Sequence, residues 1–162
     1  LGQFFERNTV MSKDSLVQII GEIDWELRGE KKGQAACTLA AVWIHQGQLH
    51  LFQVGDSHVF RVRGPEIHCL TVEEGQGRKL DHYLGMGPAI AEVMRVKSGP
   101  VQAGDVFVMV TDGVSELVDA ETIAAMWARS HGDPATCAEA IIGEVARANV
   151  EDDATVLVAL IL

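Results

Sequence analysis

Three short acidic motifs lie beside apolar segments that have the character of β-strands. They are Gly-Asp-Ser at residues 55–57, Thr-Asp-Gly at 111–113 and Asp-Asp-Ala-Thr at 152–155. A carboxylate at the end of a buried strand is costly unless it is solvated, hydrogen-bonded or bound to a cation. We therefore expect Asp56, Asp112 and Asp152 to meet at one edge of a sheet. Carboxylate oxygens are ligands that suit Mg²⁺ or Mn²⁺, so the pattern predicts a site for such ions.

The three aspartates are not equally strong candidates for metal ligands. Asp112 is the strongest candidate, because the fully apolar segment 106–110 runs directly towards it. Asp56 has a plain alternative as a turn residue between two strands, and Asp153 competes with Asp152 as the ligand. Two metal ions about 3.5–4 Å apart can hold a hydroxide and direct it at a phosphorus atom. Because the chain lacks a Walker loop, a nucleophile elbow and a G-x-G-x-x-G motif, hydrolysis by metal-activated water is the expected chemistry.

A helix, a run of strands, two helices and a last strand are expected to position these motifs. Apolar residues at spacings of three and four predict a helix over 12–29, and Asp119 and Asp133-Pro134 can start two later helices. Short turns between apolar or alternating segments predict antiparallel strands. The predicted strands are 35–45, 48–54, 59–63, 67–70, 91–96, 106–110 and 154–161, and the two later helices cover 120–130 and 134–148. A charged turn is expected at 29–33 and a loop at 73–88. The order predicts an α+β fold.

Composition limits the compartment and the partners. The chain has 162 residues, 48% of them hydrophobic, and a net charge of −10, which argues against a nucleic-acid partner. It has no apolar run long enough to span a membrane and no signal peptide, so we expect a cytoplasmic protein without a membrane partner. The three cysteines, Cys37, Cys69 and Cys137, are expected to be buried free thiols.

Several other side chains are expected to have ordinary structural roles. Arg61 and Arg63 alternate outward from a strand and are expected to be solvated, and Asp105 is expected to be a turn residue. The three tryptophans are expected to fill gaps in the core or between helices and sheet.

The order of the motifs resembles the metal-dependent PP2C-type (PPM family) serine/threonine protein phosphatases. Residues 36–41 resemble the start of a threonine-containing strand of that family, and 54–57 followed by Phe60-Arg61 resemble its G-D-S strand pair. Gly104-Asp105 followed by 110–114 is similar to its G-D, strand, S/T-D-G element. Residues 152–158 resemble its closing D-N-x-T strand. The resemblance covers roughly residues 12–162.

The resemblance implies a fold, a reaction and a ligand set. The fold would be a β-sandwich of two antiparallel sheets with helices outside. Asp112 and Asp152 would bind the catalytic pair of Mn²⁺ or Mg²⁺ ions, and Asp56 with Asp112 would bind a third ion. The reaction would be hydrolysis of phosphoserine or phosphothreonine in a phosphoprotein, such as a kinase or its target, by metal-bound water.

The chain also departs from the family pattern. The family opens with an acidic motif and D-G-x-G-G, whose aspartate bridges the metals, and no segment of this sequence matches either motif. His58 stands where many members have arginine, and Asp153 replaces the usual asparagine. We therefore expect residues 1–162 to form one PP2C-like domain that is incomplete at its N-terminus, completed by a longer parent or by a second polypeptide. The alternative functions are a regulatory module that binds a protein partner without catalysis, and a phosphatase of the related stress-response regulators.

Overall fold

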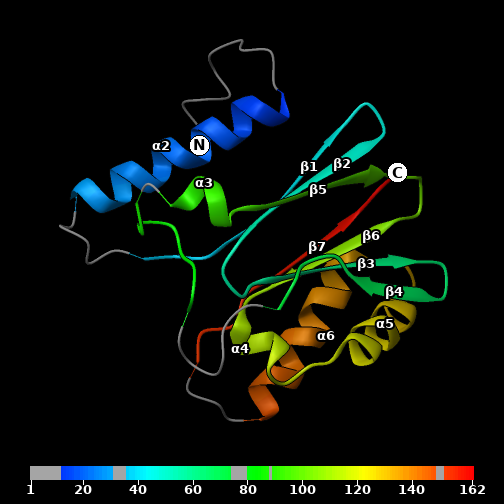
Figure 1. Ribbon diagram of the computed structural model, residues 1–162. Coiled ribbons are helices and arrows are strands. Elements are labelled where there is room, and N and C mark those ends of the chain that lie inside the picture. The colour runs from blue at the N-terminus through cyan, green and yellow to red at the C-terminus, as the bar shows by residue number, and fades with distance from the viewer. Residues whose placement is uncertain (1–11, 31–35, 74–79, 88, 149–151) are drawn as a thin grey trace.

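Two antiparallel sheets form the centre of the computed structural model, which describes residues 12–30, 36–73, 80–87, 89–148 and 152–162. The first sheet has the order β1-β2-β5 and the second the order β4-β3-β6-β7. Their strands are β1 (Leu39–His45), β2 (Gln48–Val54), β3 (His58–Arg63), β4 (Glu66–Cys69), β5 (Arg95–Pro100), β6 (Val106–Val110) and β7 (Val156–Leu160). Figure 1 shows how these strands lie between two groups of helices. The predicted α+β sandwich is confirmed.

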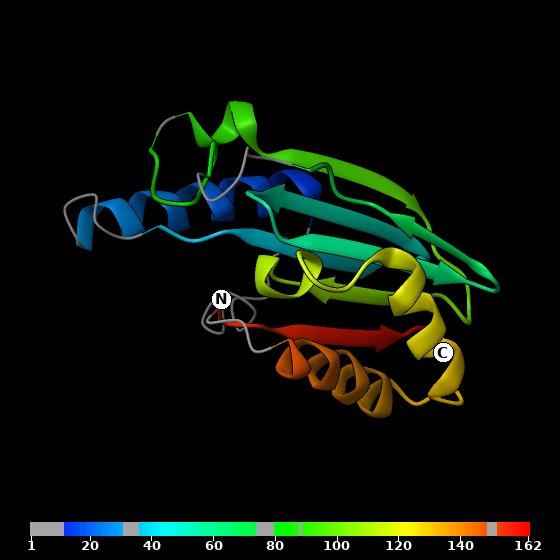
Figure 2. The ribbon, with the colours of Figure 1, turned by 90° about the horizontal axis from the view of Figure 1, so that it is seen from below.

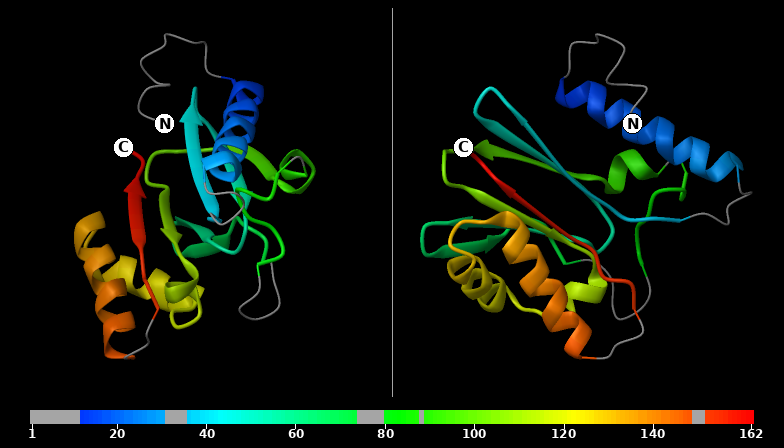
Figure 3. Two further views of the ribbon diagram at one scale, coloured as in Figure 1. Left: turned by 90° about the vertical axis from the view of Figure 1, so that its left-hand side faces the viewer. Right: turned by 180° about the vertical axis from the view of Figure 1, so that it is seen from behind.

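Helices cover the outer face of each sheet. The long helix α2 (Lys13–Glu30) and the short helix α3 (Ile90–Val93) lie on the first sheet. The second sheet is covered by α5 (Ala120–Arg129) and α6 (Pro134–Arg147), with the one-turn helix α4 (Asp112–Ser115) directly after β6. Figures 2 and 3 show the resulting layers of helix, sheet, sheet and helix. None of the described helices has the length and apolar character needed to cross a membrane.

Three apolar clusters hold the layers together. Leu49 and Leu51 of β2 contact Val59 and Phe107 between the two sheets. The other two clusters lie outside this layer, one under α2 around Phe52 and one between the second sheet and helices α5 and α6. Alternation along each strand therefore sends successive side chains into different apolar layers.

The predicted helix starts are confirmed by their capping hydrogen bonds. The Asp119 carboxylate accepts from Thr122 N at 2.8 Å, and the Asp133 carboxylate accepts from Thr136 N at 2.8 Å. These bonds satisfy backbone donors that a helix leaves free in its first turn, which explains why each helix begins where it does.

The predicted strand at 91–96 is wrong at its first residues. Residues 90–93 form α3, and β5 begins at Arg95. Ile90, Val93 and Met94 all contact the cluster under α2. Their spacing of three and four is helical, so it outweighs the apparent alternation of the segment. The turn expected at 29–33 and the loop expected at 73–88 lie partly outside the described residues.

Several side chains depart from their expected burial. Cys37 and Cys69 are exposed, so only Cys137 is the buried thiol that was expected. Trp25, expected to fill a gap in the core or between helices and sheet, is 74% exposed on α2.

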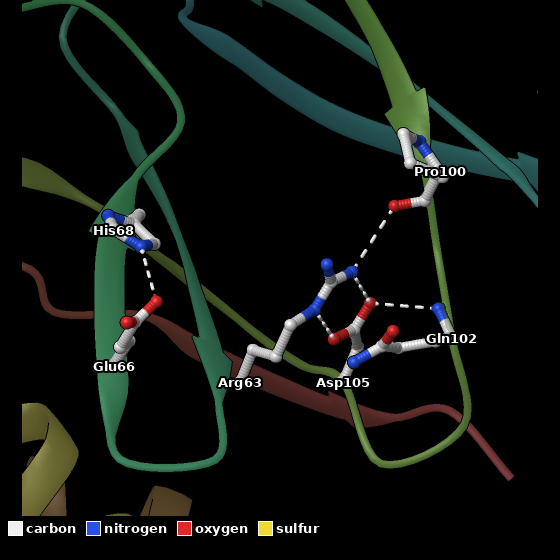
Figure 4. Close-up of polar contacts among 6 residues, drawn as sticks. All are labelled: Arg63, Glu66, His68, Pro100, Gln102 and Asp105. Atoms are coloured by element: carbon white, nitrogen blue, oxygen red, sulfur yellow. Dashed lines mark hydrogen bonds and ion pairs between the residues drawn. The ribbon is translucent and has the colours of Figure 1, made fainter.

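Arg63 is not the solvated residue that the sequence predicts, and Asp105, which does lie at the predicted turn, is also a buried ion-pair partner. The Asp105 carboxylate is fully buried and accepts from Arg63 Nε and Nη2, both at 2.6 Å, as Figure 4 shows. Its Oδ2 also accepts from Gln102 N at 3.0 Å. The two charges come from β3 and from the turn before β6, 42 residues apart in the chain. This bidentate pair fixes the end of the sheet at which β6 begins.

Candidate metal centre

The strand register brings the three acidic motifs to the same end of the second sheet. His58, the first residue of β3, pairs with Val110, the last residue of β6, and Val110 pairs with Val156, the first residue of β7. Asp56 therefore precedes β3, Asp112 follows β6 and Asp152 precedes β7 at one common edge. Figure 1 shows this edge beside α4. The register thus places the three motifs at this common end, and the metal-binding roles of their aspartates stay predictions.

The charge of Asp112 affects the ionisation of Asp56. Burial raises the pKa of the Asp56 carboxyl above its usual range, and the negative charge of Asp112 raises it further. Glu116, after α4, adds a smaller effect in the same direction, while a backbone hydrogen bond and His58 oppose it. Two carboxylates that repel each other are stabilised by a bound cation, so the donor chemistry of this edge fits a hard divalent ion. Glu116 was not singled out in the sequence, because no strand pattern points to it.

Close backbone packing joins the segment before β7 to the end of β6. A Cβ atom at Gly113 would lie 2.6 Å from the Asp153 carbonyl oxygen, so only glycine fits there without a shift of the backbone. Thr155 N donates to Thr111 Oγ1 at 3.0 Å, and Thr111 N donates to Thr155 O at 3.2 Å. The Thr-Asp-Gly motif therefore fixes the backbone of the segment that carries Asp152 and Asp153.

The carboxylates of Asp112 and Asp152 are turned towards their own chain. Gly113 N donates to Asp112 Oδ1 at 3.0 Å, and Asp153 N donates to Asp152 Oδ1 at 2.9 Å. Across the described residues, no group of three or more His, Cys, Asp or Glu side chains is placed so that it could hold a metal ion. A Mn²⁺ or Mg²⁺ ion would therefore bind at the Asp56 and Asp112 carboxylates. Backbone contacts hold the segment that carries Asp152 beside them.

A hollow of about 310 Å³ lies near this edge, between β1 and the β6–β7 pair. Four hydroxyl side chains line it, those of Thr38, Ser57, Thr111 and Thr155. Thr38 Oγ1 and Ser57 Oγ are 2.8 Å apart and share a hydrogen bond. Gly55 allows this contact: its φ is +88°, and an added Cβ would lie 2.6 Å from Thr38 Cγ2. Hydroxyl groups next to carboxylates can bind oxygens of a phosphoryl group.

A histidine and a cysteine beside the acidic edge also interact, which the sequence did not indicate. His58 Nδ1 lies 3.0 Å from Thr71 Oγ1 and 3.8 Å from Cys69 Sγ. Burial opposes ionisation of Cys69, but hydrogen bonds from His58 and Thr71 outweigh it and lower the pKa of the thiol. The hydrogen bond with Cys69 raises the pKa of His58. Only the register of β3 and β4, which pairs Phe60 with Cys69, brings these side chains together.

Comparison with known protein families assigns the sequence to one of them. Residues 5–161 match the family described as Stage II sporulation protein E (SpoIIE).

The chain belongs to the SpoIIE family.

Solved structures of phosphatases with the PP2C fold match the SpoIIE-family chain over most of its length. A bacterial serine phosphatase is 14% identical and superposes with a TM-score of 0.84, covering 99% of this chain and 75% of that one. The catalytic domain of the serine/threonine phosphatase PstP, solved with two manganese ions, is 20% identical with a TM-score of 0.76, covering 96% of this chain and 74% of that one. The SpoIIE phosphatase domain from Bacillus subtilis is 21% identical with a TM-score of 0.57, covering 96% of this chain and 76% of that one.

These likenesses confirm the fold and the resemblance to PP2C phosphatases. The chain spans 66% of the first matched structure, PppA of Pseudomonas aeruginosa, and 70% of the next, the Mycobacterium tuberculosis phosphatase PstP. A comparison with curated proteins finds no match. The roles of Asp56, Asp112 and Asp152 remain predictions.

Proposed function

We propose that this SpoIIE-family chain carries part of a divalent-metal-dependent phosphatase that hydrolyses phosphoserine or phosphothreonine in proteins. The observation that supports it best is the register of the second sheet, which brings the three acidic motifs to the end where β3 and β7 begin and β6 ends. The PP2C fold and the oxygen-rich donor set support the same reaction. The substrate would be a phosphoprotein, such as a kinase or its target.

Each residue of the edge has a distinct part in this proposal. Asp112 and Asp152 would hold Mn²⁺ or Mg²⁺, with Asp56 and Asp112 serving a further ion. Bound ions of this kind supply a water of lowered pKa and stabilise negative charge on a phosphoryl group. Thr38 and Ser57 would donate hydrogen bonds to phosphoryl oxygens from the adjoining hollow. Gly113 leaves room for the backbone of Asp153, which keeps the two acidic segments adjacent.

The proposal is tested by Mn²⁺-dependent hydrolysis of p-nitrophenyl phosphate and of a phosphothreonine peptide by the full-length protein. We expect Asp112→Asn to lower kcat/KM about a hundredfold or more, because it removes charge that holds the ions. Parallel Asp152→Asn and Asp153→Asn variants decide which neighbour is the ligand. Asp133→Asn is the matched control, since asparagine caps a helix as well as aspartate does and residue 133 lies at the start of α6. Full turnover in an Asp112→Asn, Asp152→Asn double variant would contradict the assignment.

The second candidate is a regulatory module that binds a protein partner without hydrolysis. It is favoured by the lack of a group of three or more metal-binding side chains within the described segments. PppA, which shares the fold, is described as a key regulatory component of T6SS in Pseudomonas aeruginosa. A folded full-length protein that binds no Mn²⁺ by calorimetry and turns over neither substrate would support this candidate over the phosphatase.

A further inference from the structure

A second cavity lies between the two sheets, away from the acidic edge. It has a volume of about 150 Å³ and is lined by leucines of β2, by Arg61 of β3, by Leu70 and by residues 97–100 of β5. Arg61 is three residues beyond the start of β3, which places it about 10 Å along the strand from the acidic edge. The cavity is therefore distinct from the candidate metal centre and does not depend on its function.

Strand alternation directs two cations into this layer. Phe60 and Val62 pack towards the C-terminal helices, so Arg61 extends from the opposite face of β3, as Val59 does between the sheets. On β5, Val96 packs under α2, and Lys97 extends from the other face opposite Leu51. Arg61 and Lys97 thus approach the same leucine-lined space from the two facing sheets.

Arg61 carries an unsatisfied donor in this layer. Its Nε is buried and has no hydrogen-bond partner among the residues that the structure describes. The neighbouring carboxylate of Asp105 is occupied, because both of its oxygens accept from Arg63 and Oδ2 also accepts from Gln102 N. Figure 4 shows Arg63 and Gln102 on this carboxylate. A guanidinium donor buried without a protein acceptor is costly, and such a group is commonly completed by a water, an ion or a ligand.

Lys97 adds a second positive charge beside Arg61, whose nearest acidic neighbour, Asp105, is already paired with Arg63. Its Nζ donates to the Leu70 carbonyl at 2.7 Å, which is a neutral acceptor. Neither Lys97 nor Arg61 forms an ion pair with any described residue. In a chain with a net charge of −10, two such cations at one cavity form a local exception that favours an anion.

The residues that line the cavity limit which class of anion could bind there. Leu49, Leu51 and Leu70 present apolar surface, which suits methylene groups more than a phosphate with polar oxygens on every side. The planar guanidinium of Arg61 matches the two oxygens of a carboxylate.

We propose that this cavity binds a carboxylate on a short aliphatic stem, held by Arg61 and Lys97 with the stem against the leucines. The carboxylate would come either from a free short-chain acid or from a glutamate side chain of a protein partner. Both sources share the same recognition chemistry, so the experiment needs one probe for each.

The test is calorimetric titration of the full-length protein with glutarate and with an acetylated pentaglutamate peptide at low salt, with inorganic phosphate as the competing anion. We expect one probe to bind, and we expect its Kd to rise about tenfold in Arg61→Met and in Lys97→Gln, because each variant removes a charge-assisted hydrogen bond. Lys13→Gln is the matched control, because it removes the same charge on α2, on the other side of the first sheet. Circular dichroism checks that each variant is folded. Because Lys97 is exposed, Lys97→Gln is less disruptive to the fold than Arg61→Met.

Each result decides the proposal. Binding of glutarate that is weakened by both variants supports a free acid, and binding of the peptide alone with the same weakening supports a partner segment. The proposal is overturned if neither probe binds, or if the two variants bind like Lys13→Gln. Tighter binding of inorganic phosphate through Arg61 would overturn the assignment to a carboxylate.

Discussion

Two strand-end aspartates of the second sheet have opposite environments. Asp105, before β6, is buried and is met by Arg63 on both carboxylate oxygens. Asp56, before β3 at the other end of the sheet, faces the charge of Asp112. The hydrogen bond from Arg63 lowers the pKa of Asp105, whereas burial and Asp112 raise the pKa of Asp56. A carboxylate with an internal cation stabilises the fold, and one with a second carboxylate beside it is suited to an external cation.

The largest effect expected from this difference is in Asp105→Asn. Asparagine keeps the shape of the side chain but removes its charge, leaving Arg63 without its ion-pair partner. We expect a loss of about 3 kcal/mol in the free energy of unfolding, the lower end of the range for breaking a buried pair, because Arg63 is 29% exposed and can be partly hydrated. Urea denaturation measures it, with Asp133→Asn as the control for the same chemical change on an exposed helix cap. Equal stability of the two variants would show that the pair contributes little.

Acid should remove the same contribution progressively. The native pKa of Asp105 lies below its ordinary value, so the native carboxylate stays charged at pH values where the unfolded one is already protonated. The stability from the pair is therefore complete above about pH 4 and is lost as the pH falls through the lowered native pKa. In urea denaturation from neutral to acidic pH, the difference between wild type and Asp105→Asn should shrink below about pH 4. A difference that stays constant with pH would assign the effect to packing.

The comparison also explains which parts of the molecule the sequence could predict. The strands beside Asp56 and Asp112 follow from local alternation and turn residues, and the helix starts follow from Asp119 and Asp133. By contrast, Asp105 and Arg63 are 42 residues apart, and His58 meets Cys69 only through the register of β3 and β4. These contacts are fixed by how the strands pair across the sheet, and no short motif records that.

The acidic edge could be predicted from the sequence only in part. The positions of the motifs at strand ends were predictable, because Gly-Asp follows the apolar segment 48–54, Asp-Gly follows 106–110 and Asp-Asp precedes 154–161. The hydrogen bonds that the Asp112 and Asp152 carboxylates accept from the backbone N–H of the next residue were not predictable, since they depend on local backbone angles. Glu116 was missed for a similar reason: it follows α4, a single turn that the sequence analysis did not predict.

The smallest expected change in the free energy of unfolding is that of Asp56→Asn without metal. It separates the two kinds of carboxylate most directly. Since the native pKa of Asp56 is raised, its charged form is destabilised by folding, so removing the charge should increase the free energy of unfolding at neutral pH. We expect a gain of only about 0.5 kcal/mol, because solvent screens partly exposed charges, and the gain should diminish at high salt. Mn²⁺ should reverse the order, stabilising wild type more than the variant in proportion to its tighter binding. Thermal denaturation with and without Mn²⁺ measures both effects, and loss of stability in the metal-free variant would mean that Asp56 resembles Asp105 after all.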